Sequence, residues 1–299
     1  MSRTNPNAIR SNRTANFLIY ALCGIIAFVT VYPFLYMLSM SISSPDEVVK
    51  KTIVLLPKGL SFLSYELIVQ NTQMWRAFGN SVLYTAAGTL SNIVMSLLIA
   101  YPLAKPKLVA RRFFTVFLIV PMYFTGGLIP SFILMHTLGL YNNIWAVIIP
   151  SMASIWNIII ARTFIKSLPY SLQESALVDG ASEFRILFQI IVPLSKPVMA
   201  VIGLYTAVGI WNDWFTALLY LPNSNLHPLQ MFIARLLVFN YSSIDPGSRL
   251  KLDSAVTQTG VITQMKYSVV MVTTLPILLL YPFLQKYFVK GVMIGSLKE

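Results

Sequence analysis

A polar segment between two long apolar runs carries the residues whose types and spacing could do chemistry. It contains Glu174–Ala176, then Gly180, then nine further residues, then Ile190–Pro193. Two carboxylates, Glu174 and Asp179, stand beside small side chains. A groove of a partner protein could therefore approach the backbone closely and pair with the acids through Arg or Lys. These residue types predict ionic docking and no catalysis. The alternative is an ordinary loop in which Glu174 and Gly180 only build local caps.

The same segment predicts a helix-turn-helix. Ser171 and Glu174 have the spacing of a capping box, in which the Ser hydroxyl accepts a backbone N–H and the Glu reaches back to another. Gly180 is placed to end the first helix in a left-handed conformation, which costs glycine little. Ser182 can cap a second helix, which is expected to stop near Pro193 because proline has no N–H to donate.

A second set of polar and aromatic residues lies within apolar sequence. Asp213 is the only formal charge inside a predicted membrane span, and an intramembrane acid is a functional candidate by default, although it could pair structurally with a neighbouring helix. Trp211 and Trp214 could stack on a ligand ring or form one packed helix face. Asn157 and Asn212 are further candidates for a substrate pathway.

Other chemistries have no support in the residue pattern. The two histidines, His136 and His227, fall in connections predicted outside the spans, and no metal-ligand or nucleophile–base cluster lies within them, which argues against an intramembrane enzyme. No G-x-x-x-x-G-K-[ST] phosphate loop is present, so this chain is not expected to hydrolyse a nucleotide. The single cysteine, Cys23, cannot form an intrachain disulfide.

The elements that position these residues are predicted to be membrane helices. The chain is 56% hydrophobic and 11% charged, whereas a soluble domain carries roughly 25% charged residues. A span needs about 20 mostly apolar residues. Six stretches meet that length: Ala15–Met40, Gly79–Ala104, Phe113–Met135, Asn143–Ala161, Val198–Tyr220 and Tyr267–Gln285. The turn residues of Leu138–Asn143 predict a tight hairpin between the third and fourth spans.

The distribution of basic residues predicts the orientation. Of the Lys and Arg residues, 14 lie on the side that holds both termini and the polar segment, and eight lie on the other side. Both termini and the segment are therefore expected in the cytoplasm. The net charge of +12 does not indicate nucleic-acid binding, because the basic residues lie in short tracts beside apolar runs. The outer segments Ser41–Phe78 and Leu221–Lys266 are expected to be solvated connectors that could also receive an extracytoplasmic partner.

The polar segment resembles the EAA loop of permeases from ATP-binding-cassette (ABC) importers: EAA, three residues, G, nine residues, I-x-L-P. It departs from that pattern at Ser175, usually Ala, and at Val192, usually Leu, and both changes keep size and position. Most of the chain resembles the maltose-type permeases of carbohydrate importers. Three sequence segments are similar to those of the subgroup for oligosaccharides and uronic-acid-containing glycans, such as aldouronate- or alginate-type permeases. These segments are Met122–Phe132, Arg162–Pro169 and Trp211–Phe215.

The resemblance implies an all-α polytopic membrane protein with six transmembrane helices and a cytoplasmic coupling helix-turn-helix before the fifth. It implies a cytoplasmic tail at 1–14, a transmembrane domain at 15–290 with the coupling loop at 165–197, and a second tail at 291–299 that could reach between the ATPases. The residues it implies for ATPase coupling are Glu174, Ser175, Ala176, Asp179, Gly180, Ala181, Arg185 and Pro193.

The resemblance also implies the partners and the location. These are a homologous second permease, two ATPase subunits that hold ATP and Mg²⁺, an extracytoplasmic solute-binding protein, a carbohydrate substrate and the lipid of a bacterial inner membrane. No cofactor or metal is expected on this chain. Transport would proceed by alternating access. The alternative, an ion- or proton-coupled secondary transporter, predicts several intramembrane ionisable residues, and only Asp213 fits.

Overall fold

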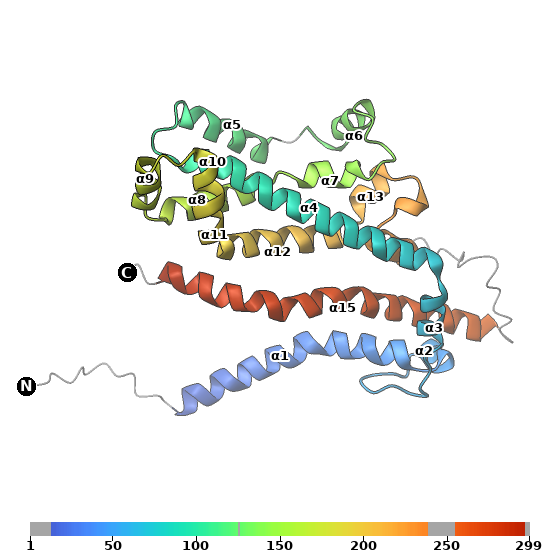
Figure 1. Cartoon of the computed structure of the whole chain (residues 1–299). Helices are drawn as coiled ribbons and strands as arrows, with labels where there is room; N and C mark the ends of the chain where they lie inside the picture. Colours follow the sequence, from blue (N-terminus) through green and yellow to red (C-terminus); the bar gives the residue numbers. More distant parts are fainter. Residues whose placement is uncertain (1–12, 125, 239–254, 297–299) are drawn as a thin grey trace, which may run out of the picture. The chain divides into compact units, whose positions relative to one another are not determined.

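The computed structural model describes residues 13–124, 126–238 and 255–296, and the regular elements within these ranges are helices (Figure 1). This confirms the predicted all-α fold. Four helices are long and apolar enough to cross a membrane, and the number reaches six if each of two bent helix pairs is one span. The chain divides into two compact units: unit 1 holds residues 1–68 and 245–271, and unit 2 holds residues 69–244 and 272–299.

Unit 1 is held together by buried polar contacts between its two chain segments. Its helices are α1 (Arg13–Ile42), α2 (Pro45–Lys50), most of α3 (Leu63–Gln70) and the first part of α15 (Ala255–Ser296). Gln264 Nε2 donates to the carbonyl oxygens of Ser41, at 3.1 Å, and Ser61, at 2.9 Å. The hydroxyl oxygens of Ser64 and Ser268 lie 2.7 Å apart. Each bond satisfies a polar group that burial would otherwise penalise.

Gly260 allows α15 to approach α2 closely. A Cβ built on Gly260 would lie 2.3 Å from the carbonyl oxygen of Pro45, and backbone atoms cannot move aside as a flexible side chain can. A residue without a side chain is therefore required where these two backbones meet.

Helix α1 has the length of a membrane span and almost no intrachain cover. It contains 30 residues, and its most apolar window is 0% buried. Large apolar side chains such as Phe17, Leu22 and Phe28 are exposed. An apolar helix without intrachain cover needs lipid or another protein around it.

Unit 2 is built around α4 (Thr72–Ala104), which packs against α7, α8, α12 and α14. The other helices of this unit are α5 (Arg111–Tyr123), α6 (Leu128–Thr137), α7 (Trp145–Ser151), α8 (Ile155–Ser167), α9 (Ser171–Val178), α10 (Glu183–Ile186), the π-helix η1 (Leu187–Ile191), α11 (Val192–Leu194), α12 (Lys196–Asn212), α13 (Phe215–Tyr220), the 3₁₀ turn η2 (Ser224–Leu226) and α14 (Leu229–Val238). The larger core cluster joins α4, α8, α10, η1 and α12, and so brings the polar loop onto the membrane helices.

Three predicted spans are interrupted, and the fourth has its break between Ser151, where α7 ends, and Ile155, where α8 begins. The third is divided into α5 and α6 by a sharp bend after Tyr123. Gly127, with φ +86°, lies in a backbone region that glycine enters at little cost. The fifth ends as α12 at Asn212, and α13 begins at Phe215. Asp213 Oδ1 accepts the N–H of Thr216 at 3.0 Å, so this acid caps α13 in place of continuing α12.

The connections at Ser41–Phe78 and Leu221–Lys266 contain helices in their described parts, which corrects the expectation of simple solvated connectors. The first contains α2 and α3, and the second contains η2 and α14. Leu229 and Met231 of α14 are buried, as is Val48 of α2. The hairpin predicted at 138–143 is confirmed, with Gly139 and Asn142 at positive φ.

Candidate functional site

The first helix of the polar loop, α9, begins without the predicted capping box. Tyr170 is its N-cap and already has helical angles, φ −65° and ψ −26°, and no side chain caps the helix. The carbonyl of Pro169 accepts from Leu172, and the carbonyl of Tyr170 accepts from Glu174. Ser171 therefore lies inside the first turn, where its backbone cannot take the extended conformation that an N-cap needs.

The end of α9 forms as predicted. Gly180 has φ +76°. The N–H of Gly180 donates to Leu177 O at 3.1 Å, and the N–H of Ala181 donates to Ala176 O at 2.9 Å. This pair of bonds is a Schellman motif, which satisfies the last carbonyls of the helix. The chain then reverses to start the second helix, so Gly180 sets the direction of the turn.

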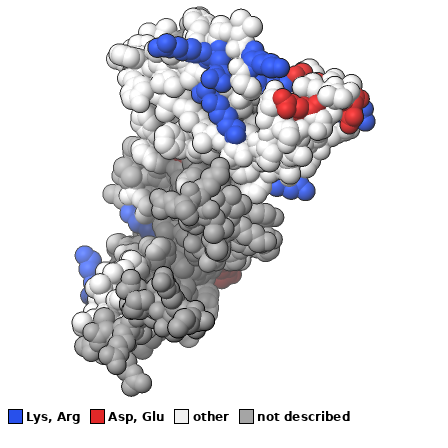
Figure 2. All heavy atoms as spheres, turned by 90° about the vertical axis from the view of Figure 1, so that its left-hand side faces the viewer, with Lys and Arg blue, Asp and Glu red and all other residues white. Residues whose placement is uncertain are grey.

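The loop presents its acids outward and one alanine pair inward. Glu174, Ser175, Asp179 and Gly180 are exposed. Ala176 and Ala181 are half-buried and pack against the core of unit 2, so Ala176 is not part of a fully open face. On the face that carries α9, acidic side chains gather on one side and basic side chains on the other (Figure 2). Glu174 makes no side-chain hydrogen bond within the described part of the chain. Its carboxylate is thus available to another molecule.

The second helix of the loop ends one residue after Pro193, close to the predicted stop. Ser182 caps α10 as expected, because its hydroxyl accepts the N–H of Arg185 at 3.3 Å. The chain winds on through η1 and α11 to Leu194, and Pro193 lies within α11. A π turn shifts the backbone hydrogen bonds by one residue and so accommodates a proline that cannot donate. The helical end and α12 then meet at a bend of 78°.

Arg185 is paired locally. Its Nε donates to Gln189 Oε1 at 2.9 Å, one turn further along the same helical segment. Both side chains are exposed. Exposed pairs of this spacing are weak, so this bond leaves the guanidinium free to exchange partners.

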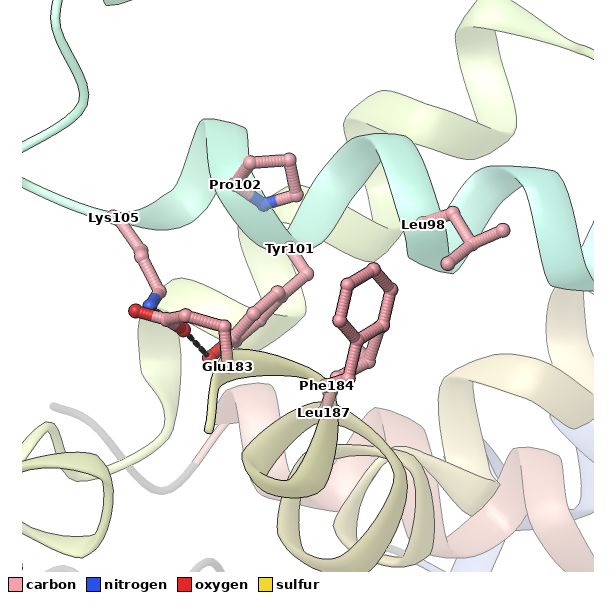
Figure 3. A pocket seen from close by; sticks show the side chains of 7 residues that line it. All are labelled: Leu98, Tyr101, Pro102, Lys105, Glu183, Phe184 and Leu187. Atoms are coloured by element: carbon pink, nitrogen blue, oxygen red, sulfur yellow. Dashed lines mark hydrogen bonds and ion pairs between the residues drawn. The ribbon is translucent and has the colours of Figure 1, made fainter. Parts of the chain in front are cut away.

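A polar contact that sequence reasoning missed joins the loop to the end of α4. Glu183 Oε2 accepts from the Tyr101 hydroxyl at 2.7 Å and from the Lys105 ammonium (Figure 3). Lys105 Nζ also lies 4.7 Å from the centre of the Tyr101 ring. The two donors hold the pKa of Glu183 below its usual value, Lys105 having the larger influence. Some 80 residues separate the partners, so no local pattern could reveal them.

Asn157 lies in a buried polar cluster. Its Nδ2 donates to Asn92 Oδ1 at 2.8 Å and to Thr206 Oγ1 at 3.0 Å. Asn92 Nδ2 donates to the carbonyl of Ser151 at 2.7 Å. The cluster joins α4, α8 and α12, and these bonds give Asn157 a structural role.

Replacing Asn92 with Leu is expected to lower the stability of unit 2 by about 1–3 kcal/mol, because Asn157 and the Ser151 carbonyl would lose buried partners. Thr206→Val, which removes one hydroxyl and leaves the Asn pair, should cost less than about 1 kcal/mol. Thermal unfolding of the purified protein in detergent measures both. Equal midpoints for the two variants would contradict the assignment of Asn92 as the centre of the cluster.

The remaining pathway candidates differ in exposure. Trp211 is buried, donates its indole N–H to Thr273 O at 3.2 Å and packs edge-on against Phe78. It lines an almost wholly apolar cavity of about 710 Å³ between α4, α12 and α15. Trp214 and Asn212 are exposed, and Asp213 is half-buried at the break after α12. The tryptophans therefore do not form one packed face.

The segment before α14 is fixed to the start of α4. Asn80 Nδ2 donates to Asn225 O at 2.8 Å and to His227 O at 3.1 Å. Tyr84 donates to Leu226 O at 2.8 Å. His227 is buried with its Nε2 2.7 Å from Leu221 O. Burial lowers the pKa of His227, so the neutral ring is favoured.

This segment is expected to loosen in acid. A histidine whose folded pKa lies below its unfolded value stabilises the fold fully above the unfolded pKa, and this contribution is lost as pH falls through the folded pKa. His227→Gln, which keeps a neutral donor, should reduce the fall of the melting midpoint between about pH 7 and pH 5 by a few degrees. Thermal unfolding against pH measures this. An unchanged pH dependence would contradict the buried neutral ring.

No group of three or more metal-ligating side chains occurs within residues 13–124, 126–238 and 255–296. His136 lies beside the rings of Phe132 and Tyr141, and His227 bonds to the backbone. The exposed acids of the loop are suited to bind cationic side chains.

Comparison with known proteins gives consistent matches. The family model described as binding-protein-dependent transport system inner membrane component matches residues 92–294. Protein LplC of Bacillus subtilis (strain 168) is 35% identical over 285 residues, covering 94% of this chain and 95% of that protein. The polygalacturonan/rhamnogalacturonan transport system permease protein YtcP of the same organism is 34% identical over 287 residues, covering 96% and 99%.

A solved structure matches over almost the whole chain. It belongs to a bacterial ABC transporter involved in the import of the acidic polysaccharide alginate. The TM-score is 0.84 at 30% identity, with 95% of this chain and 100% of that chain covered.

Proposed function

The chain belongs to the family of binding-protein-dependent transport system inner membrane components, and on this premise we propose that it is the permease subunit of an ABC importer for an acidic oligosaccharide. It is a membrane transport subunit. The observation that carries the proposal is the loop of α9 and α10, whose exposed acids precede a left-handed glycine at the EAA spacing.

The proposed role of this loop is to bind an ATPase subunit. Glu174, Ser175 and Asp179 supply the exposed contact, and Gly180 and Ala181 form the turn that presents it. Ala176 acts from within by fixing α9 to the core of unit 2, Pro193 lies exposed within α11, and Arg185 adds a cation at the edge. A homologous second permease and two ATPase subunits, which hold ATP and Mg²⁺, would complete the membrane complex.

The proposed orientation puts this loop and both termini in the cytoplasm, in the inner membrane of a bacterium. Its support is the excess of Lys and Arg on that side. The proposed tails at 1–14 and 291–299 flank the transmembrane domain, and residues 1–12 and 297–299 lie outside the described residues. On the opposite side, the folded segments that contain α2, α3 and α14 are the proposed contact for a solute-binding protein.

The proposed substrate is an oligosaccharide with uronic-acid units. Its support is that YtcP is named for polygalacturonan and rhamnogalacturonan and that the matching structure is of an alginate importer. Trp214 and Asn212 are the exposed pathway candidates, with Asp213 at the break between α12 and α13. Trp211 and Asn157 are buried, so their proposed role is to support the residues that line the pathway and not to contact the substrate.

The test is a reconstituted complex of both permeases and the ATPases in lipid nanodiscs. ATPase activity should rise when the solute-binding protein is added with oligogalacturonate or oligoalginate, and uptake into liposomes should follow. A neutral glucan of the same length is the matched control. Stimulation by the neutral glucan alone would refute the acidic substrate, and a lack of ATPase binding would refute the importer assignment.

A further inference from the structure

The contact between the polar loop and α4 has a role beyond stabilising the loop. Glu183, the first residue of α10, accepts from Tyr101 at 2.7 Å and from Lys105, and these donors stand at the last turn of α4 and just after it. Lys105 lies over the Tyr101 ring, with its side chain only 19% exposed. The three side chains therefore form one connected unit, named the Glu183 tie.

The packing beside the tie is incomplete. Leu98 and Pro102 of α4 face Phe184 and Leu187 of the loop across an open cavity of about 400 Å³ (Figure 3). Phe184 is 70% exposed. Apolar contact holds segments firmly only where the surfaces interlock. Beside this hollow, the tie adds a directional contact between α10 and the end of α4 to the apolar packing of Ile186 and Leu187 in the core cluster.

The tie matters for movement because α4, to which it connects the loop, packs against much of unit 2. Helices α5, α7, α8, α12 and α14 of unit 2 pack against α4, so a displacement of α4 shifts much of the unit. The covalent route from the second helix of the loop, which carries Glu183, runs instead through η1, α11 and the 78° bend into α12, while the first helix, α9, is joined to α8. A bend can absorb part of a movement by changing its angle. The tie offers a second route that bypasses the bend.

We infer that Glu183 is a positioning residue for energy coupling, which ties the ATPase-binding loop to α4 so that movement of the loop moves the membrane helices. This rests on the proposed function of the loop. Glu183 need not touch the ATPase, because it acts through Tyr101 and Lys105. Its removal should leave docking intact and weaken the transfer of movement.

The experiment compares variants in the complete complex in nanodiscs. Glu183→Gln keeps the shape and removes the charge, and Tyr101→Phe removes only the hydroxyl. Assembly and basal ATPase activity should stay at wild-type values. Stimulation by the loaded binding protein should fall about fivefold in Glu183→Gln and about twofold in Tyr101→Phe. The double variant should fall no further than Glu183→Gln, since both act through one carboxylate.

Two further variants keep the test sharp. Exchange of the charges, Glu183→Lys with Lys105→Glu, should recover part of the stimulation that Glu183→Lys alone loses. Lys107→Gln removes an exposed charge between α4 and α5 that is not part of the tie, and it should leave stimulation unchanged. Wild-type stimulation in Glu183→Gln would overturn the inference, as would loss of assembly in that variant. A wild-type complex without any stimulation would instead refute the proposed function.

Discussion

Replacing Glu174 with Lys is expected to prevent the ATPase subunits from co-purifying with the permeases. Glu174 is exposed on α9 and forms no side-chain hydrogen bond within the described chain, so the substitution breaks no internal side-chain contact. In a cationic groove the new ammonium would replace an attraction by a repulsion, and truncating one partner of a buried charge pair already costs about 2–5 kcal/mol. Recovery of ATPase should fall at least about tenfold, because 1.4 kcal/mol is a factor of ten in affinity.

The controls for Glu174 separate docking from folding. An acid in the first turn favours a helix by about 0.3–1 kcal/mol, so part of any loss could come from α9 itself. Glu174→Gln keeps the size and should give an intermediate loss. Lys107→Glu reverses another exposed charge, between α4 and α5, and should leave recovery unchanged. Undiminished recovery and substrate-stimulated activity in Glu174→Lys would show that this carboxylate does not meet the ATPase.

Replacing Gly180 with Val is expected to abolish transport while leaving the permease in the membrane. Nothing lies within 4 Å of a Cβ built on Gly180, so the substitution meets no clash with its surroundings. The cost arises from φ +76°, a conformation that carries strain of about 1–3 kcal/mol for a residue with a side chain and is worst for a β-branched one. The turn would open, and the acids of α9 would point elsewhere.

A graded series tests the conformational origin of that loss. Asn tolerates the left-handed region, whereas Val does not, although both add a Cβ. Transport should rank Gly, Asn, Ala and Val in descending order, measured as uptake by reconstituted vesicles at equal permease content. A ranking by side-chain volume, with Asn below Ala, would point to a steric contact with the ATPase in place of backbone strain.

Local chemistry determined how much of the loop could be predicted. Gly180 and Ser182 were placed correctly because a left-handed turn and an N-cap each depend on one residue and its immediate neighbours. The capping box at Ser171 was wrong because Tyr170 already carries helical angles. The Glu183 tie could not be foreseen, since its partners meet only after α4, α8 and the loop have packed together.

The membrane spans, like the loop, were predicted in part. Hydropathy located apolar stretches of which four form helices long and apolar enough to cross a membrane, because a bilayer selects for length and apolarity. It placed continuous helices through Gly127 and Asp213, where the structure has breaks. Averaging over a window hides a single residue that prefers a turn or a cap, and both breaks occur at such residues.

Because of the π-helix η1, the number of residues in the loop determines how far one end of its second helix is rotated about the helix axis relative to the other. An α-helix turns by about 100° per residue, so one residue more or fewer between two points rotates one end against the other by that amount. The nine residues between Gly180 and Ile190 include the extra residue that η1 accommodates. Deleting one would let the segment rewind as an ordinary α-helix and swing the acids of α9 around its axis. Chimeric permeases that exchange this loop must therefore conserve its residue count as strictly as its acids.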